Sequence, residues 1–354
     1  MVTAILLSAG YGERLKPLTF SVPKPLIKIM GKPIIRWIID DLSSCGIDDY
    51  VVVVGHYSIA VKDYIENIGI NARFAYQSAR LGVADAIMRG IDAGVSEPFI
   101  VAFTDNYFHG GMCSYARRFI EERDYDAYIV LAMHRRKELF GNVVIQDGKV
   151  KTIIEKPKQP PENSYVLTGL MAFRDVDTYA KLFSKLSPSS RGEFEITDLL
   201  TQYLIEGRTV KYVITKDWWK DMGTYDDLLE LIQYMLDEIR EPRIYGAVDG
   251  NIHGRVIVES GAEVHGDVYG PAYIGRNTII ERGASVEHFV NIEDSVRISG
   301  ERSRITRTFI YDNAQITMIN ALLHDSVVGP NSIINARDGS YRLIIGERSV
   351  VETF

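Results

Sequence analysis

The residues best suited to chemistry lie directly behind the first apolar run, which extends from Val2 to Leu7. The chain continues there as SAGYGERLKPLTFSVPKP, which contains two glycines, Arg14 and Lys24. The backbone N–H groups of a glycine-rich loop behind a strand can surround phosphate oxygens. Leu15 stands where a dinucleotide loop has its third glycine, and the P-loop string G-x-x-x-x-G-K-[ST] does not occur. The stretch therefore predicts a phosphate loop of another kind or an ordinary turn.

Two aspartates and one acid–base pair follow in later segments. Asp105 closes the apolar run FIVAFTDN, Asp221 lies in WWKDMGT, and the pair Glu155 and Lys156 lies in EKP. Mg²⁺ takes few protein oxygens when phosphates and water supply the others, so two carboxylates are sufficient. Cations from separate segments suit the charge that develops in phosphoryl transfer. The set indicates phosphate chemistry assisted by Mg²⁺.

Composition narrows the class of protein. The 354 residues are enough for two domains, 46% are hydrophobic and 25% are charged, and the formal net charge is -7. This charge argues against a nucleic-acid partner. No apolar run reaches the roughly 18 residues needed to span a membrane, and none has the form of a secretory signal. The two cysteines, Cys45 and Cys113, have no metal-like spacing, so we expect a cytoplasmic protein.

Short apolar runs and helical patterns alternate up to about Lys216. The runs are VTAILLSA, YVVVVG, ARFAYQ, FIVAFTDN and AYIVLAMH, and the helical patterns include PIIRWIIDDLSSCG and VADAIMRGIDAG. The alternation predicts an α/β domain of Rossmann-like type with a mostly parallel sheet, followed by a hairpin at Asp147-Gly148. Ligands bind such sheets outside the carboxyl ends of the strands, where the glycine loop and FTDN both fall.

Behind the amphipathic pattern YDDLLELIQYMLDEIREPR, apolar residues recur at every sixth position. They are Ile252, Val258 and Val264, then Ile274, Ile280, Val286, Ile292 and Ile298, then Ile310, Ile316, Leu322, Val328 and Ile334. This hexapeptide repeat predicts a left-handed β-helix. We therefore place the domains at residues 1–240 and 241–354. The open ends and flat sides of a β-helix need covering, so we expect it to mediate homo-oligomerisation.

Taken in order, the glycine loop, FTDN, EKP and WKDMG resemble the sugar-1-phosphate nucleotidylyltransferases. The resemblance extends from Ile5 to about Glu230. FTDNYFHGGM and the closing RLIIGERSVV are similar to the long-form glucose-1-phosphate thymidylyltransferases, which carry a C-terminal β-helix. The resemblance implies small-molecule substrates: dTTP and glucose 1-phosphate would give dTDP-glucose and pyrophosphate. The sugar phosphate is already an anion near neutral pH, so this reaction requires positioning and cations instead of a general base.

The resemblance also implies a role for each matched residue. The catalytic cations would be Arg14, Lys24 and Lys156. The nucleotide would be bound by Leu7, Ala9, Gly10, Gly12, Arg14, Gln77 and Gly82, with Gln77 and Gly82 at the base. The sugar phosphate would be bound by Asn106, Gly141, Glu155, Lys156 and Gly169. Mg²⁺ would be bound by Asp105 and Asp221.

Some residues depart from the family pattern. Glu13 replaces a usual threonine and Tyr11 an often small residue, while Thr104 replaces a glycine and Phe140 a tyrosine. A carboxylate beside a triphosphate repels it unless it points away or pairs with a base. The segment RGEFEITD fits a structural role as well as a functional one, and a core hydrogen bond explains Gln77 almost as well as base recognition.

Other functions stay open at this point. UTP or another sugar 1-phosphate is the nearest alternative within the same reaction. Some hexapeptide β-helices are acyltransferases with a histidine base, so a bifunctional enzyme is the rival from another class. The seven histidines show no metal spacing and receive no role. A non-catalytic regulatory or assembly protein is a third class, and the presence of Arg14, Lys24, Asp105 and Asp221 argues against it.

Overall fold

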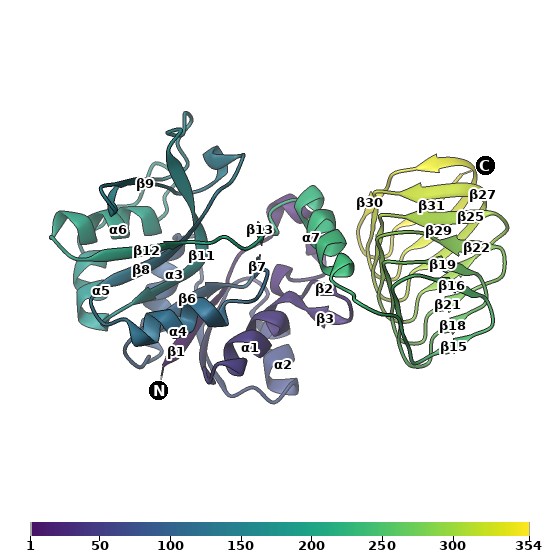
Figure 1. Cartoon of the computed structure of the whole chain (residues 1–354), viewed down its shortest axis with the longest axis horizontal. Helices are drawn as coiled ribbons and strands as arrows, with labels where there is room; N and C mark the ends of the chain where they lie inside the picture. Colours follow the sequence, from purple (N-terminus) through teal and green to yellow (C-terminus); the bar gives the residue numbers. More distant parts are fainter. Residues whose placement is uncertain (1, 354) are drawn as a thin grey trace. The chain divides into compact units, whose positions relative to one another are not determined.

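The computed structural model describes residues 2–353, and the contacts divide the chain into two units (Figure 1). Unit 1 consists of residues 1–11 and 35–221, and unit 2 of residues 12–34 and 222–354. Among residues 2–353, no helix is both long and apolar enough to cross a membrane.

Unit 1 contains a nine-stranded sheet in the order β10-β9-β11-β6-β1-β4-β5, with β8 paired to β11 and β12 paired to β8. Its strands are β1 (Thr3–Ser8), β4 (Asp49–Val54), β5 (Ala72–Tyr76), β6 (Phe99–Phe103), β8 (Ala127–Ala132), β9 (Asn142–Gln146), β10 (Lys149–Ile154), β11 (Ser164–Phe173) and β12 (Val210–Ile214). Its helices are α1 (Ile34–Ser44), α2 (Ser58–Asn67), α3 (Val83–Asp92), α4 (Cys113–Glu121), α5 (Val176–Phe183) and α6 (Ile196–Ile205).

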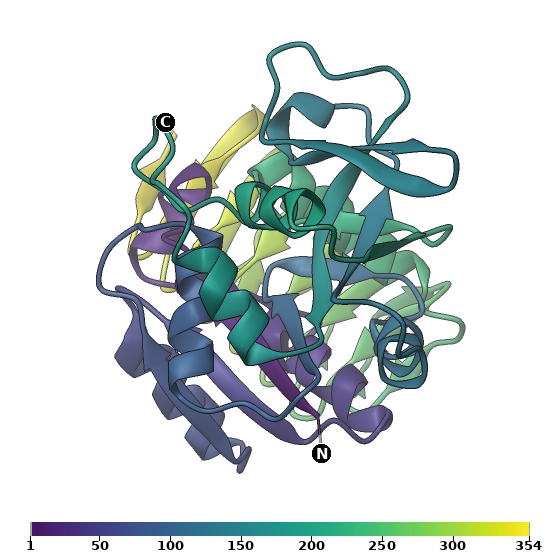
Figure 2. The same cartoon turned by 90° about the vertical axis from the view of Figure 1, so that its left-hand side faces the viewer.

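The first half of this sheet confirms the predicted α/β class. Strands β6, β1, β4 and β5 are parallel neighbours. The nearly continuous apolar sequences of β6, β1 and β4 are buried on both faces, whereas the edge strand β5 is only partly buried. Helices α3, α5 and α6 contribute to the core on one face, and helices pack over the strands in Figure 2. The second half is mixed, because β11 runs antiparallel to β6, β8 and β9. The predicted hairpin is β9–β10.

Unit 2 contains helix α7 (Tyr225–Asp237), the short hairpin of β2 (Lys28–Ile29) and β3 (Lys32–Pro33), and a β-helix. Thr224 caps α7, because its Oγ1 accepts the N–H of Asp227 at 3.2 Å. One β-helix sheet has the order β14-β17-β20-β23-β26-β28-β30, and a second sheet of eleven strands contains the others.

The strands of the β-helix are short and parallel. They are β14 (Arg243–Ile244), β15 (Ala247–Val248), β16 (Asn251–His253), β17 (Val256–Val258), β18 (Glu263–Val264), β19 (Asp267–Tyr269), β20 (Ala272–Ile274), β21 (Ile279–Ile280), β22 (Ala284–Val286), β23 (Val290–Ile292), β24 (Arg297–Ser299), β25 (Ser303–Thr306), β26 (Phe309–Ile310), β27 (Gln315–His324), β28 (Val327–Val328), β29 (Ile333–Tyr341), β30 (Ile344–Ile345) and β31 (Val350–Glu352). The predicted hexapeptide β-helix is thereby confirmed as a parallel β-helix.

Register places most of the predicted repeat residues inside the β-helix. Ile274 pairs with Ile292, and Ile292 with Ile310, so one coil takes 18 residues here. The repeat prediction was wrong at Leu322, because Ile305 pairs with Leu323 and Leu323 is the fully buried residue. The pattern slips because the step from Ile316 to Leu323 has seven residues, one more than a hexapeptide, as the step from Ile298 to Ile305 has in the coil before.

The grouping of contacts differs from a division at residue 240. Residue 240 was chosen because the hexapeptide repeat begins shortly after it in the sequence. By its contacts, however, helix α7 belongs with the β-helix, and so does the segment of residues 12–34. The segment is thus part of unit 2, although the strand before it belongs to unit 1.

Candidate active site

In unit 1, the carboxyl ends of β1 and β6 lie side by side. Leu7 pairs with Phe103 in parallel register. Thr104 fastens the two ends, since its Oγ1 donates to the carbonyl of Leu7 at 2.8 Å and accepts from Ser8 Oγ at 3.1 Å. This contact accounts for a threonine where the family pattern has glycine. The predicted nucleotide-binding residues Leu7, Ala9 and Gly10 and the predicted metal ligand Asp105 therefore lie at one edge of the sheet.

The segments of the two predicted metal ligands are adjacent. Strand β7 (Asn106–Phe108) pairs antiparallel with β13 (Trp219–Asp221), and Asp221 stands opposite Asn106, the residue that follows Asp105. The segments that carry these two aspartates are therefore neighbours, although they lie far apart in the sequence. Among residues 2–353, no group of three or more His, Cys, Asp or Glu side chains could hold a metal. A pair of carboxylates fits Mg²⁺ that takes its other oxygens from phosphates and water.

Asn106 directly follows Asp105, and both ends of its amide form hydrogen bonds within the protein. Its Nδ2 donates to Asp105 Oδ1 at 2.8 Å, and its Oδ1 accepts from Trp219 Nε1 at 2.7 Å and from the Gly169 N–H at 3.3 Å. The residue is only 2% exposed. These bonds orient the Asp105 carboxylate, and they place Gly169, on β11, next to Asn106. The role of Trp219 as a hydrogen-bond donor was not predictable from the sequence, because tryptophans in such positions usually pack.

The predicted pair Glu155 and Lys156 forms a second polar cluster in unit 1. Lys156 Nζ lies 3.2 Å from Glu155 Oε1. Arg191 Nη2 donates to Glu155 Oε1 at 2.8 Å, and Thr197 Oγ1 donates to Oε2 at 3.0 Å. Gly141 lies against Thr197 and Glu155, since a Cβ at 141 would come within 2.6 Å of Thr197 Cγ2 and 3.5 Å of Glu155 Oε2. The structure therefore brings Gly141, Glu155 and Lys156 together.

The backbone at Lys156 is strained. Its φ of 38° lies in the left-handed region, which costs roughly 1–2 kcal/mol for a lysine. The conformation is held in part by the Lys156 N–H, which donates to the carbonyl of Phe140 at 3.2 Å. Strain of this kind concentrates at functional sites. The observation supports a functional interpretation of Lys156 over that of a solvated strand end.

The segment RGEFEITD proves to support this cluster. Arg191 also donates to Glu195 Oε1 at 2.8 Å, and Glu195 is nearly buried. Burial lowers the pKa of Arg191, but its hydrogen bonds to Glu195 and Glu155 and their charges raise it above the ordinary value overall. Burial, with the nearby charges of Glu195 and Glu155, raises the pKa of Asp198. Sequence reasoning left Arg191 without a role, because its contact with Glu155 is visible only in the fold.

The predicted base-recognition residues lie together behind β5. Gln77 Nε2 donates to the Gly82 carbonyl and to Asp85 Oδ2, both at 2.9 Å. Gly82 directly precedes α3, where the N–H of Ala84 donates to the Phe194 carbonyl at 3.0 Å. The Gln77 amide group therefore serves the local structure, which favours the structural interpretation of that side chain.

An aromatic and cationic group at the end of unit 1's first segment was missed by the sequence analysis. The Tyr11 ring stacks on His56 with centroids 5.5 Å apart, and the Arg80 guanidinium lies 4.1 Å from the Tyr11 ring centre. Cations over aromatic rings are attracted by the ring quadrupole. The departure at Tyr11 therefore has a structural reason, since a small residue would leave Arg80 and His56 without this ring.

The loop of residues 12–34, in unit 2, carries the other predicted phosphate ligands. Gly12 has a φ of 63°, and a Cβ there would come within 2.9 Å of Thr19 Cγ2, so glycine is required. Arg14 lies in an exposed turn of 3-10 helix (Glu13–Leu15), and Lys24 begins another (Lys24–Leu26). Glu13 Oε2 pairs with Lys16 Nζ at 2.6 Å. The carboxylate that would repel a triphosphate is thus balanced by a base within the loop.

Comparison with known proteins agrees with this geometry. The nucleotidyl transferase family model matches residues 3–238. The chain is 28% identical to glucose-1-phosphate thymidylyltransferase of Streptomyces antibioticus, over 99% of both chains. It is 31% identical to the UTP–glucose-1-phosphate uridylyltransferase AglF of Haloferax volcanii, over 66% of this chain and 97% of that protein. A Bacillus anthracis crystal structure assigned as a glucose-1-phosphate thymidylyltransferase, in complex with a sucrose, superimposes with a TM-score of 0.60 at 28% identity, covering 69% of this chain and 98% of that one.

The family match covers the strands and loops that carry Asp105, Glu155, Lys156 and Asp221. It also includes the loop of residues 12–34 and all of α7. The chain therefore belongs to the nucleotidyl transferase family, within which it resembles the sugar-1-phosphate nucleotidylyltransferases.

Proposed function

We propose that the protein is a Mg²⁺-dependent glucose-1-phosphate thymidylyltransferase, which forms dTDP-glucose and pyrophosphate from dTTP and glucose 1-phosphate. The pairing of β7 with β13 carries this proposal, because it joins the segments of Asp105 and Asp221 at the edge where β1 ends. The similarity to the Streptomyces antibioticus enzyme supports the choice of base and sugar. The similarity to AglF makes UTP the nearest alternative to dTTP.

Asp105 and Asp221 would hold Mg²⁺, and Asn106 fixes the orientation of the first of these carboxylates. Once bound, Mg²⁺ would neutralise phosphate charge. Arg14 and Lys24 lie in the loop that follows β1 in the chain, and there they would bind the triphosphate oxygens. Lys156 would bind the phosphate of the sugar, and Glu155, oriented by Arg191 and Thr197, would accept hydrogen bonds from sugar hydroxyls.

The residues of the chain then act by positioning. A sugar-phosphate oxygen attacks the α-phosphorus in line, the bond to the β-phosphate oxygen breaks, and pyrophosphate leaves. The attacking phosphate is already ionised, so no side chain has to remove a proton. Aligning two anions that repel each other is the main difficulty, and fixed cations reduce it.

A pyrophosphate-release assay over a matrix of nucleotides and sugar 1-phosphates tests the proposal. We expect the highest kcat/KM with dTTP and glucose 1-phosphate in the presence of Mg²⁺. A higher value with UTP would correct the base, and a higher value with another sugar would correct the acceptor. Absence of pyrophosphate with every pair would contradict the function. Adding acetyl-CoA with amino-sugar phosphates tests the rival activity, for which CoA release is the signal.

Replacing Lys156 by methionine tests its role at the sugar phosphate. A charged hydrogen bond contributes about 1.5–3 kcal/mol, so kcat/KM for glucose 1-phosphate should fall by roughly 10- to 150-fold. The KM for dTTP should change little, because the lysine is assigned to the other substrate. Lys158→Met removes an exposed cation two residues away and serves as the control. An equal loss in both variants would refute a specific role for Lys156.

A further inference from the structure

One outer face of the β-helix is covered, although its residues point away from the interior. In β23, the side chains of Val290 and Ile292 belong to the interior core, so Asn291 between them faces outward. Asn291 aligns with Tyr273 in β20 and with Phe309 in β26, and all three are no more than 3% exposed. Helix α7 packs on β23. The hairpin β2–β3, from the loop of residues 12–34, contacts the same column.

The hairpin turn is bonded through its backbone to two polar residues of one coil. The N–H of Met30 donates to Asn291 Oδ1 at 2.9 Å, and the N–H of Gly31 donates to Glu293 Oε2 at 3.1 Å. Glu293 is completely buried and also accepts from Asn291 Nδ2 at 2.7 Å. Gly31 lies so close to Tyr273 that a Cβ would stand 2.3 Å from its hydroxyl oxygen, so the turn fits only as glycine.

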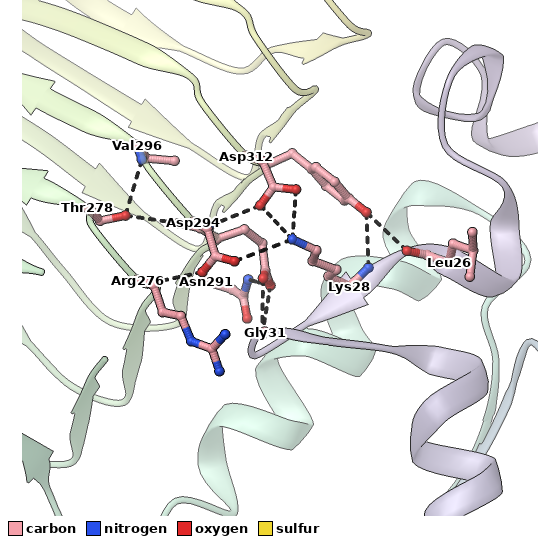
Figure 3. A network of polar contacts seen from close by, with 11 residues as sticks. Leu26, Lys28, Gly31, Arg276, Thr278, Asn291, Asp294, Val296 and Asp312 are labelled. Carbon is pink, nitrogen blue, oxygen red and sulfur yellow. Dashed lines mark hydrogen bonds and ion pairs between the residues drawn. The ribbon is translucent and has the colours of Figure 1, made fainter. Parts of the chain in front are cut away.

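Lys28 binds the first strand of the hairpin to the β-helix through ion pairs. Its Nζ lies 2.9 and 2.8 Å from the two carboxylate oxygens of Asp312 and 3.5 Å from Asp294 Oδ2. Asp312 is itself oriented by the N–H of Asp294 at 3.1 Å, which links two successive coils (Figure 3). Burial lowers the pKa of Lys28, but Asp312, Asp294 and Glu293 together raise it above the ordinary value. The Lys28 N–H also donates to the hydroxyl of Tyr311 at 3.3 Å.

The other end of the loop is fastened to α7 and to the last coil. The hydroxyl of Tyr225 donates to the Leu15 carbonyl at 2.6 Å and accepts from the Leu18 N–H at 3.1 Å. A Cβ at Gly346, in the last coil, would come within 2.9 Å of Pro17 Cβ. Arg14 and Lys24 therefore lie in a loop that α7 and the β-helix hold on both sides.

We propose that the β-helix is a template for the conformation of the loop of residues 12–34, and that Lys28 is a positioning residue for nucleotide binding by Arg14 and Lys24. This inference rests on the proposed function, because it assigns the triphosphate to those cations. It gives the β-helix a part in substrate binding that is separate from assembly. The ion pair of Lys28 with Asp312 and the buried bonds to Asn291 and Glu293 supply the restraint.

The test uses the full chain with Lys28→Met, which keeps the aliphatic stem and removes the charge. We expect faster hydrogen–deuterium exchange across residues 12–34 without ligand. We also expect a rise in KM for dTTP on the order of tenfold, as for other small misplacements of binding groups. The KM for glucose 1-phosphate should stay within about twofold of the wild type, because that substrate is assigned to residues outside the loop.

Two further variants make the result decisive. Exchanging the charges, in the double variant Lys28→Asp with Asp312→Lys, should restore most of the dTTP affinity. Arg304→Met removes a comparable ion pair, with Glu287, from the eleven-stranded sheet, and it should leave dTTP binding unchanged. Unchanged exchange in Lys28→Met would overturn the template. Faster exchange with an unchanged KM for dTTP would overturn the positioning role. Failure of the proposed function itself is distinct, because it would appear in the wild type as no turnover of any nucleotide.

Discussion

Replacing Asp105 by asparagine is expected to lower kcat by about 10³-fold, equivalent to roughly 4 kcal/mol of transition-state stabilisation. The substitution keeps the size of the side chain and removes one negative charge from the pair that we assign to Mg²⁺. The Asn106 Nδ2 group, which donates to Asp105 Oδ1 at 2.8 Å, can still donate to the oxygen of the new amide. The local structure should therefore persist while the affinity for the cation falls.

The measurement combines pyrophosphate release with titration of Mg²⁺ and with calorimetry of Mn²⁺ binding in the presence of dTTP. Residual activity of Asp105→Asn should need a higher Mg²⁺ concentration, and Asp221→Asn should behave in the same way. The control is Asp147→Asn, which makes the same change of charge in the exposed turn of the β9–β10 hairpin. It should leave kcat and the Mg²⁺ requirement unchanged. Normal turnover by Asp105→Asn at low Mg²⁺ would show that the metal assignment is wrong.

The edge at which Asp105 and Asp221 lie was predictable from the sequence for a physical reason. Buried parallel strands are continuous runs of β-branched residues, and their carboxyl ends must share an edge, so the glycine loop and FTDN had to lie near each other. The neighbourhood of Asp221 is different, because it depends on a three-residue ribbon between β7 and β13. A ribbon of that length has no periodicity to detect, and only the family resemblance indicated it.

Polar networks inside the site were not predictable, since hydrogen bonds between distant segments leave no pattern in one sequence. Asn106 was assigned to the sugar pocket from its position beside Asp105. In the structure its amide bonds to Trp219, Gly169 and Asp105, which favours an orienting role. Glu13 is the opposite case: its pairing with Lys16, three residues later in the chain, is local enough that the sequence already contained both partners.

The β-helix shows the same contrast. Its inward positions repeat with the coil and could be read from the spacing, apart from the slip at Leu322. Its outward positions were not predicted, although Asn291 stands between Tyr273 and Phe309 in a column that continues with Val327. A polar residue in an apolar outer column indicates that another segment bonds to it. That segment is the hairpin at Lys28, more than 260 residues earlier in the chain.

The pH dependence of stability should reveal the buried carboxyl group of Glu293. Burial, partly offset by Asn291 and Lys28, raises the pKa of Glu293 to about 7 from its ordinary 4.5. Because the folded-state value is the higher one, its contribution to stability is fully present below pH 4.5 and is lost as the pH rises through about 7. A difference of this size corresponds to about 3 kcal/mol at pH 8. Glu293→Gln, which cannot ionise, should be free of this loss.

We therefore expect the wild type and Glu293→Gln to have similar unfolding midpoints near pH 4.5, and the variant to be the more stable protein at pH 8. The difference between the two curves isolates this residue, since every other carboxylate titrates in both proteins. Among the groups that face Glu293, Lys28 should stay charged, because its acidic neighbours outweigh burial and raise its pKa. Tyr273 and Tyr311 should stay neutral, because burial raises their pKa values. Hydrogen–deuterium exchange of residues 28–33 should accelerate with pH beyond the intrinsic increase only in the wild type. The reason is that ionised Glu293 destabilises the site on the β-helix to which the hairpin β2–β3 binds. If the stability curves of the wild type and Glu293→Gln are parallel from pH 4.5 to 8, Glu293 is ionised throughout and its surroundings are solvated. That outcome would contradict the burial of Glu293.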